Sequence, residues 1–354
     1  MKILDLFKQE GAKNITIRKP YVIAEAGVNH EGDMEIAKRL INDAAEGGAD
    51  AIKFQTYKAE TIASKFSPSY WDTSKEPTKS QYLLFKKYDK FWKPEYEKLK
   101  VLCDQNNIEF MSTPFDIESA NFLNDMMDVF KISSSDIDNM PFINHICNFE
   151  KPILLSTGAS YISEINEALS WVNKKKVPIA LLHCILNYPT ENKNAHLSMI
   201  RDLQNKFPDI MIGYSDHTLP LNSMEVLQIA TLMGAVIIEK HFTHNKKLKG
   251  NDHYHSMDKH DLKLFNQKLL NLFSILGNTN KEPIALEEIA RNNARRSLVA
   301  VCDIPKNTII RKEHLTWKRP AHGISPKDIN KVIGKKSKNT INEDDLIQWD
   351  SFIS

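Results

Sequence analysis

The chain has 354 residues, of which 42% are hydrophobic and 26% charged, and its formal net charge is +2, values that are typical of a soluble globular protein. No apolar run approaches the roughly 20 residues needed to cross a bilayer, and the segment from Met1 to Lys19 lacks the apolar core of a secretory signal. The near-neutral charge argues against a nucleic-acid partner, and four scattered cysteines without a CxxC pair indicate free thiols in a reducing cytoplasm.

Short apolar runs recur along the chain as far as residue 245, and chemically capable side chains follow them. Amphipathic stretches of helical length separate these runs, a pattern that predicts parallel strands joined by helical crossovers. The eight runs begin at Val22, Ala51, Phe110, Val129, Ile153, Ile179, Ile210 and Val236. Eight such units predict a (β/α)8 TIM barrel, whose active site lies at the C-terminal ends of the strands.

The connecting stretches predict one helix after nearly every strand. The first has apolar positions from Ile36 to Ala45 on one face, with Asp33 as its cap and Gly47-Gly48 at its end. Further helices are expected at 92–106, 116–126, 161–173, 195–206, 221–233 and 258–275. The long connection from Tyr57 to Asp89 is rich in aromatic residues, so we expect an ordered flap beside the site.

Composition changes near Gly277, where a polar and charged stretch begins. A strand is expected at 297–302, and turn signals and short strand-like runs continue to the end of the chain. We therefore predict a barrel domain at 1–280, a linker at 281–294 and a small β-rich domain at 295–354. About 60 residues form too small a core to be obviously stable without docking on the barrel.

Two lysines, Lys53 and Lys131, follow apolar runs in the same register. A lysine is a compact charge that suits phosphate or carboxylate, and the hydroxyls of Ser134 and Ser156 would complete an anion cradle beside Gln55. Two alternatives remain open: either lysine could be a surface or barrel-rim residue, or one could be a desolvated Schiff-base nucleophile.

His217 and His241 follow the seventh and eighth runs, which are adjacent in a closed barrel, so both imidazoles could bind one metal ion. Nearby acids could provide oxygen ligands or their hydrogen-bond partners: Glu25, Asp216, Glu239 and Asp252. The tract from Asn251 to His255 is a second metal candidate, although we expect its histidines to be solvated or to shape the substrate pocket. Together the two clusters predict a site that holds a phosphorylated carboxylate beside a metal-polarised oxygen, which suits the addition of an enol to a carbonyl.

Ordered motifs accompany these residues at Ile23–His30, Gly48–Gln55, Ser112–Asp116, Phe130–Asp136, Leu155–Gly158, Leu182–Cys184, Gly213–Thr218 and Glu239–Phe242. They resemble the bacterial sialic acid synthase family, and the segment Trp317-Lys-Arg-Pro-Ala-His-Gly323 is similar to the SAF (antifreeze-like) domain that ends those enzymes. The resemblance covers nearly the whole chain in order. It implies a TIM barrel followed by a small β-clip-like SAF domain.

The resemblance also implies a reaction: condensation of phosphoenolpyruvate with N-acetylmannosamine or a related amino sugar to a nine-carbon 2-keto-3-deoxy acid, with release of phosphate. It assigns phosphoenolpyruvate to Lys53, Lys131, Ser134, Ser156 and Ser215. It assigns a divalent metal, usually Mn²⁺ but also Mg²⁺ or Co²⁺, to His217 and His241, and the sugar to Glu25, Gln55, Tyr188 and Asp252. Arg319 would reach the sugar's acyl group in the other protomer of a domain-swapped homodimer, and Glu25 or Asp136 would be the general acid or base.

In three places the sequence differs from the family pattern: the segment Lys131-Ile-Ser-Ser-Ser-Asp136, the position of Asn187, and Ala321-His322. By the resemblance, all three places lie next to the sugar. The acceptor therefore stays open between N-acetylmannosamine, a 6-phosphorylated sugar, and the 6-deoxy-2,4-diacetamido sugar of a legionaminate or pseudaminate synthase. Two further hypotheses also stay open. One is a metal-independent Schiff-base aldolase that uses Lys131, and the other is a non-catalytic carbohydrate-binding protein on the same fold.

Overall fold

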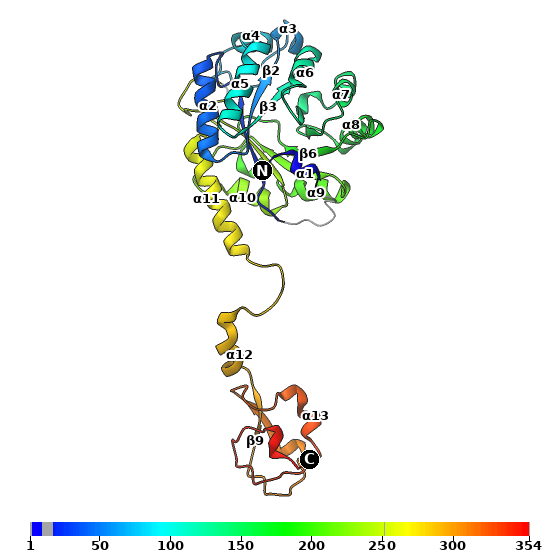
Figure 1. Cartoon of the computed structure of the whole chain (residues 1–354), viewed down its shortest axis with the longest axis vertical. Coiled ribbons are helices and arrows are strands. Elements are labelled where there is room, and N and C mark those ends of the chain that lie inside the picture. Colours follow the sequence, from blue (N-terminus) through cyan, green and yellow to red (C-terminus); the bar gives the residue numbers. More distant parts are fainter. Residues whose placement is uncertain (1, 9–16, 251, 354) are drawn as a thin grey trace. The chain divides into compact units, whose positions relative to one another are not determined.

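The computed structural model describes residues 2–8, 17–250 and 252–353. In this part of the chain, eight parallel strands lie in the order β3-β2-β1-β8-β7-β6-β5-β4, and β3 also contacts β4, so the sheet nearly closes on itself (Figure 1). The strands are β1 Tyr21–Gly27, β2 Ala51–Thr56, β3 Glu109–Pro114, β4 Phe130–Ile132, β5 Ile153–Ser156, β6 Ile179–Cys184, β7 Met211–Asp216 and β8 Ile237–His241. The predicted TIM barrel is confirmed, and each strand falls on one of the eight apolar runs.

Helices surround the barrel (Figure 1). They are α2 Met34–Gly47, α5 Lys93–Gln105, α6 Ile117–Leu123, α7 Met140–Cys147, α8 Ile162–Lys174, α9 Ser198–Lys206, α10 Glu225–Leu232 and α11 Lys259–Leu276. Helix α2 begins as predicted, because the Asp33 side chain accepts hydrogen bonds from the amides of Glu35 and Ile36. The sequence analysis missed the short helix α7. Among the described residues, no helix is both long and apolar enough to cross a membrane.

The alternation of side chains along each strand sorts them into two layers. On β1, Val22 and Ala24 pack outward against the helices, whereas Tyr21 and Ile23 belong to the core inside the barrel. Because successive residues of a strand point to opposite faces, Glu25 lies on the inner side above Ile23. The same alternation brings further polar side chains inside at the strand ends: Lys53, Gln55, Lys131, Ser156, Ser215, Glu239 and His241.

The opposite end of the barrel interior is apolar and closed. The short helix α1 (Leu4–Lys8) contributes Leu6 to the inner core, together with Ile3 just before it. The Ile3 amide and the Tyr21 hydroxyl both donate to Glu109 at the start of β3, at 3.0 and 2.7 Å. The residues of the two predicted polar clusters thus line the barrel interior at the C-terminal ends of its strands, as expected for this fold.

The chain divides into two compact units, Met1–Gly277 and Asn278–Ser354. The second contains helices α12 (Glu288–Ala294) and α13 (Ile329–Val332) and the antiparallel strands β9 (Ser297–Ala300) and β10 (Leu315–Lys318). It has a hydrophobic core of its own: Leu298, Ala300, Ile304, Ile310, Leu315, Ile324, Val332, Ile341, Ile347 and Phe352. This small β-rich unit confirms the second part of the predicted fold, and helix α12 occupies the stretch in which we expected only a linker.

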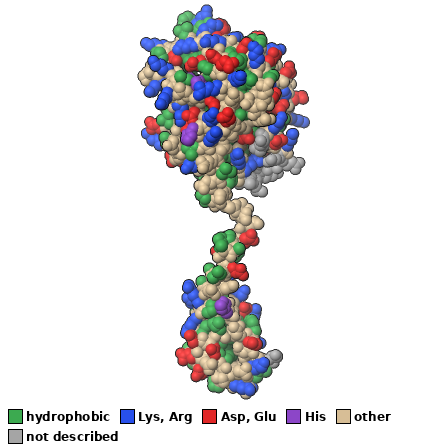
Figure 2. All heavy atoms as spheres, turned by 60° about the vertical axis from the view of Figure 1, so that its left-hand side comes forward, with side chains coloured by type: hydrophobic (Ala, Val, Ile, Leu, Met, Phe, Trp, Pro, Cys, Tyr) green, Lys and Arg blue, Asp and Glu red, His purple; other side chains and the backbone are tan. Residues whose placement is uncertain are grey.

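Figure 2 shows basic and acidic side chains interspersed over the visible face of the barrel unit. The four cysteines are free thiols, with Cys103, Cys147 and Cys184 buried and Cys302 exposed. The free thiols agree with the expectation from the sequence.

Candidate active site

A cationic cavity of about 390 Å³ opens at the C-terminal end of the barrel. The two lysines predicted to bind an anion both line it, and their side chains are only 3% and 4% exposed. Lys53 Nζ contacts Glu25 and donates to Thr113 Oγ1 at 2.8 Å, and Lys131 Nζ donates to Ser156 Oγ at 2.7 Å. Both lysines are therefore interior residues, which rules out the surface alternative.

Glu239 lies between the two lysines, with its carboxylate oxygens 3.8 Å from each Nζ, and it accepts a hydrogen bond from Ser215 at 3.0 Å. Burial opposes its ionisation, but the two lysines and Ser215 outweigh that cost and hold the pKa of Glu239 below its usual value. Glu25 differs, because burial outweighs the attraction of Lys53 and raises the pKa of Glu25 to about 7. Burial thus opposes the negative charge of Glu25, and the two lysines beside these acids favour an anionic ligand.

Small residues complete the anion cradle beside Lys131. The amide of Gly158 donates to Ser134 Oγ at 2.9 Å. A Cβ at Gly158 would lie 3.0 Å from both Ser134 Oγ and Cys184 Sγ, so a side chain there would crowd the cradle. Ser134, Ser156 and Ser215 all line the cavity, as do both lysines. The structure thus brings together all five residues that the resemblance assigned to phosphoenolpyruvate.

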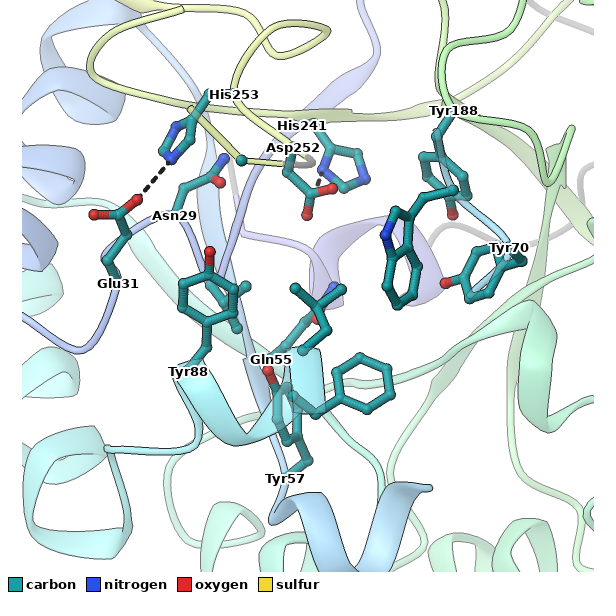
Figure 3. Close-up of a pocket in the computed structure, with 15 residues that line it drawn as sticks. Asn29, Glu31, Gln55, Tyr57, Tyr70, Tyr88, Tyr188, His241, Asp252 and His253 are labelled. Carbon is teal, nitrogen blue, oxygen red and sulfur yellow. Dashed lines mark hydrogen bonds and ion pairs between the residues drawn. The ribbon is translucent and has the colours of Figure 1, made fainter. Parts of the chain in front are cut away.

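A second cavity of about 740 Å³ adjoins the first, and the two share Gln55, Tyr188 and His241 as lining residues. Figure 3 shows Tyr57 and Tyr88 on one side of this cavity and Tyr70 and Tyr188 on another. Two pairs of side chains, Glu31 with His253 and His241 with Asp252, also line it. Much of its wall comes from the long connection after β2, which contains helices α3 (Ala59–Ile62) and α4 (Gln81–Tyr88). The expected aromatic flap beside the site is therefore present.

The flap has its own internal supports. Trp71 is 8% exposed, and its indole Nε1 donates to the carbonyls of Glu76 and Thr78 at 3.1 Å each. Lys87 of α4 forms an ion pair with Glu76 at 2.7 Å. Phe66, in contrast, is 94% exposed and does not line the cavity.

Imidazoles gather where the two cavities meet. The ring centroids of His217 and His241 are 5.4 Å apart, as expected for residues after neighbouring strands. The His217 Nδ1 donates to the Ile185 carbonyl at 2.7 Å, which leaves its Nε2 as the nitrogen with a lone pair. Burial lowers the pKa of both rings, to about 4 for His217 and well below its usual value for His241, so both are neutral and able to bind a metal near pH 7.

The tightest group of metal-binding atoms consists of His241, Asp252 and His255, whose donor atoms all lie within 4.8 Å of one another. His241 Nδ1 is buried without a hydrogen-bond partner among the described residues and lies 3.7 Å from Asp252 Oδ2. Two imidazoles and a carboxylate fit a divalent transition metal such as Mn²⁺ or Co²⁺ better than Mg²⁺, which prefers oxygen ligands. His217 borders this group without being one of its three members.

One expectation needs correction, and the structure decides between the two alternatives of another. Asp216 points away from the site, because it alternates with Ser215 and His217, and it pairs outside the barrel wall with Lys240 at 2.8 Å. His253 and His255 are not solvated, since they are 3% and 0% exposed, and His253 lines the larger cavity, which agrees with the second alternative for this tract. Asn251, the first residue of their tract, lies outside the described residues.

Of the two other assigned residues, one lines neither cavity and the other belongs to the C-terminal unit. Asp136 follows β4 in a short turn, where Asn139 donates to it at 3.0 Å, and it is not among the residues that line either cavity. Burial raises the pKa of Asp136 as well. Arg319 is exposed in the C-terminal unit, just after β10.

Residues that the sequence analysis left unassigned also line the site. Thr113, at the end of β3, binds Lys53, and Asn29 and Glu31, in the turn after β1, line the larger cavity. These three residues follow apolar runs, and that position could have identified them as site residues from the sequence. His255 lies in a loop without a periodic pattern, and only its place in the histidine-containing tract that ends there marked it as a metal candidate.

Residues 40–281 match the NeuB family, and residues 295–353 match the SAF domain. The chain belongs to the NeuB family. The predicted resemblance to the bacterial sialic acid synthases, with their SAF domain, is therefore confirmed.

Relatives of this NeuB-family chain match it over nearly its full length. The N,N'-diacetyllegionaminic acid synthase of Campylobacter jejuni is 38% identical, over 94% of this chain and 100% of its own. The human N-acetylneuraminate-9-phosphate synthase is 30% identical, over 92% of this chain and 91% of its own. The crystal structure of N-acetylneuraminic acid (sialic acid) synthetase from Leptospira borgpetersenii, in complex with citrate, has a TM-score of 0.67 and 35% identity and covers 77% of this chain and 90% of its own.

Proposed function

We propose that the protein is a nonulosonic acid synthase that condenses phosphoenolpyruvate with an amino sugar and releases phosphate. The observation that carries the proposal is the junction of two cavities at His241, one lined by buried lysines and serines and the other by aromatic and acidic side chains. Phosphoenolpyruvate would occupy the first and the open-chain sugar the second. The aldehyde carbon would then lie between them, and family membership supports this chemistry.

In the proposed reaction, C3 of phosphoenolpyruvate attacks the sugar aldehyde and a new carbon–carbon bond forms. Positive character develops at C2, water adds there, and phosphate leaves by cleavage of the bond between C2 and the bridging oxygen. Lys53, Lys131 and the three serines would hold the donor so that the attack becomes effectively unimolecular. A divalent cation held by the histidine cluster would polarise the aldehyde oxygen.

We assign proton transfer to Glu25 rather than to Asp136. Glu25 lines the cationic cavity and accepts a hydrogen bond at 3.1 Å from Gln55, which lines both cavities. It could therefore deliver a proton to the aldehyde oxygen as the carbon–carbon bond forms. Asp136 would act as a support for the turn after β4.

The pH dependence tests this assignment. Only protonated Glu25 can act as an acid, and its pKa is raised to about 7, so kcat/KM should fall as the pH rises through about 7. Bound phosphoenolpyruvate adds negative charge and raises this pKa further, so kcat should fall at a higher pH. Glu25→Gln should lower kcat by at least about 100-fold and remove this alkaline limb. The same limb in the Glu25→Gln profile would assign it to another group.

The larger cavity supports an unphosphorylated acceptor. None of its described lining residues is a lysine or arginine, whereas Glu31 and Asp252 would repel a sugar phosphate. Eight of the described lining side chains are aromatic or aliphatic and suit acyl and deoxy-sugar methyl groups: Val28, Tyr57, Tyr70, Trp71, Leu84, Phe85, Tyr88 and Tyr188. Together with the similarity to a legionaminic acid synthase, this favours a 6-deoxy-2,4-diacetamido sugar over N-acetylmannosamine, and both over a 6-phosphorylated sugar.

A phosphate-release assay tests both the function and the acceptor. With phosphoenolpyruvate and saturating Mn²⁺, kcat/KM should be highest for the 6-deoxy-2,4-diacetamido sugar and at least about tenfold lower for N-acetylmannosamine 6-phosphate, because unpaired like charges cost more than 1.4 kcal/mol. Preference for the phosphorylated sugar would overturn the acceptor assignment. No phosphate release with any member of the panel would contradict the synthase itself and favour a binding protein.

We further propose that Arg319 acts on the partner's barrel in a domain-swapped homodimer of a cytoplasmic enzyme. Its exposed guanidinium could donate to an acyl oxygen of the sugar. Mixing Arg319→Ala with Lys131→Ala protein should restore part of the activity, because some heterodimers would contain one intact composite site. If subunit exchange is demonstrated and no activity returns, Arg319 does not act in trans.

A further inference from the structure

Glu31 and Tyr88 line the larger cavity with polar groups that the proposed reaction does not use. The Glu31 side chain is 40% exposed, and one of its carboxylate oxygens accepts from His253 Nε2 at 3.3 Å. The other oxygen and the Tyr88 hydroxyl have no hydrogen-bond partner among the residues that the structure describes. Burial and the charges of Glu76 and Glu31 raise the pKa of Tyr88 to about 12, so its hydroxyl stays protonated and can donate near neutral pH.

A network of hydrogen bonds holds the Glu31 carboxylate in place. Burial lowers the pKa of His253, so its ring is neutral near pH 7. Because a carboxylate can only accept, His253 Nε2 carries the proton, and Nδ1 accepts from the Thr243 hydroxyl at 2.8 Å. The backbone of Glu31 is held as well, with φ at +52° and its carbonyl accepting from Lys90 Nζ at 3.1 Å. One carboxylate oxygen is therefore committed to His253, and the other is available to a ligand.

An acylamino group fits this pair of polar side chains. Its N–H donates and its carbonyl accepts, whereas the Glu31 carboxylate can only accept and the Tyr88 hydroxyl can donate. Leu84 and Phe85, from the same helix α4 as Tyr88, also line the cavity and would contact the acyl methyl group. Figure 3 shows Glu31 and Tyr88 away from Tyr188, which lines both cavities. The acylamino group would therefore belong to the part of the sugar far from the reacting aldehyde.

We propose that Glu31 and Tyr88 bind the 4-acylamino group of the acceptor sugar and thereby determine its specificity. The Glu31 carboxylate accepts from the N–H of this group, and the Tyr88 hydroxyl donates to its carbonyl. This inference rests on the proposed function and names the residues that select its acceptor. In an acylamino group the carbonyl oxygen stands two bonds beyond the nitrogen, whereas a hydroxyl at C4 ends at its first atom and would reach Glu31 alone.

Phosphate release with two acceptors tests the proposal: the 6-deoxy-2,4-diacetamido sugar and its analogue with a hydroxyl at C4. The full-length protein is used with phosphoenolpyruvate and saturating Mn²⁺. In Glu31→Gln the amide oxygen would stay with His253, and an NH₂ group would face the N–H of the sugar. Therefore kcat/KM for the diacetamido sugar should fall by about 10- to 150-fold. The 4-hydroxyl can accept from that NH₂, so kcat/KM for the analogue should change by less than about threefold.

Tyr88→Phe keeps the ring and removes only the donor. The ratio of kcat/KM for the diacetamido sugar to that for the analogue should fall by about three- to tenfold, the loss expected for one neutral hydrogen bond. The matched control is Tyr82→Phe, which should leave this ratio unchanged. Tyr82 belongs to the same helix, but its hydroxyl donates to Glu60 at 3.3 Å and it does not line the larger cavity.

The outcomes separate the inference from the function on which it rests. A reduced ratio in both variants, with turnover of the 4-hydroxy analogue retained, would support the proposal, and that turnover also shows that the variants are folded. An unchanged ratio in either variant, an equal loss with both sugars, or a preference of the unaltered protein for the analogue would overturn it and leave the synthase proposal standing. No phosphate release by the unaltered protein with either sugar would instead contradict the synthase.

Discussion

Replacing His241 with alanine is expected to lower kcat by about 100- to 1,000-fold, because Lewis-acid polarisation of a carbonyl contributes several kcal/mol to transition-state stabilisation. His241 lines both cavities and also belongs to the candidate metal group. Its loss would therefore affect both the bound ion and the position of the reacting carbon. Chelation of the unaltered enzyme should abolish phosphate release, and added Mn²⁺ should restore it.

The control for this variant is His183→Gln. His183 is also buried on a barrel strand, but its ring faces the outer layer, where it contacts the Ala195 carbonyl at 2.9 Å and stacks on Tyr214. This variant should keep its activity and its response to chelation. Full activity of a demonstrably metal-free enzyme would remove the metal from the reaction.

Replacing Lys131 with methionine, which keeps much of its length but not its charge, is expected to lower kcat/KM for phosphoenolpyruvate by about 10- to 150-fold. This range corresponds to a hydrogen bond from a charged donor, about 1.5 to 3 kcal/mol. Lys53→Met should have a similar effect, since both lysines flank Glu239. Unchanged kinetics in both variants would exclude them from the donor site.

The same lysine allows a test of the Schiff-base alternative. Burial lowers the pKa of Lys131, which would help it to act as a nucleophile. In a Schiff-base aldolase, borohydride with substrate would label Lys131 covalently and irreversibly inactivate the enzyme, and chelation would have no effect. In the proposed synthase, borohydride leaves no adduct on the lysine. Mass spectrometry of the treated protein therefore separates the two mechanisms.

The sequence alone determined the barrel and much of the site because both follow from local patterns. Eight apolar runs at crossover spacing specify parallel strands, and the alternation of side chains then decides which polar residues enter the barrel. Lys53, Lys131, Ser156 and His241 were therefore identified from their place in a strand, whereas Ser215 was assigned through the resemblance. The same alternation, applied to Asp216, would have predicted its outward position and its pairing with Lys240.

Only the tertiary structure decided the features that depend on long-range contacts. His255 lies in a loop with no periodic pattern, and the pairing of Met257 with the end of β8 is what brings it to His241. Likewise, the pKa of Glu25 is raised because burial outweighs the attraction of Lys53, and the pKa of Glu239 is lowered because Lys131 and Lys53 outweigh its burial. Spacing along a chain encodes the direction of a side chain within a strand, but loop positions and electrostatic balance depend on residues that folding brings together from separate strands.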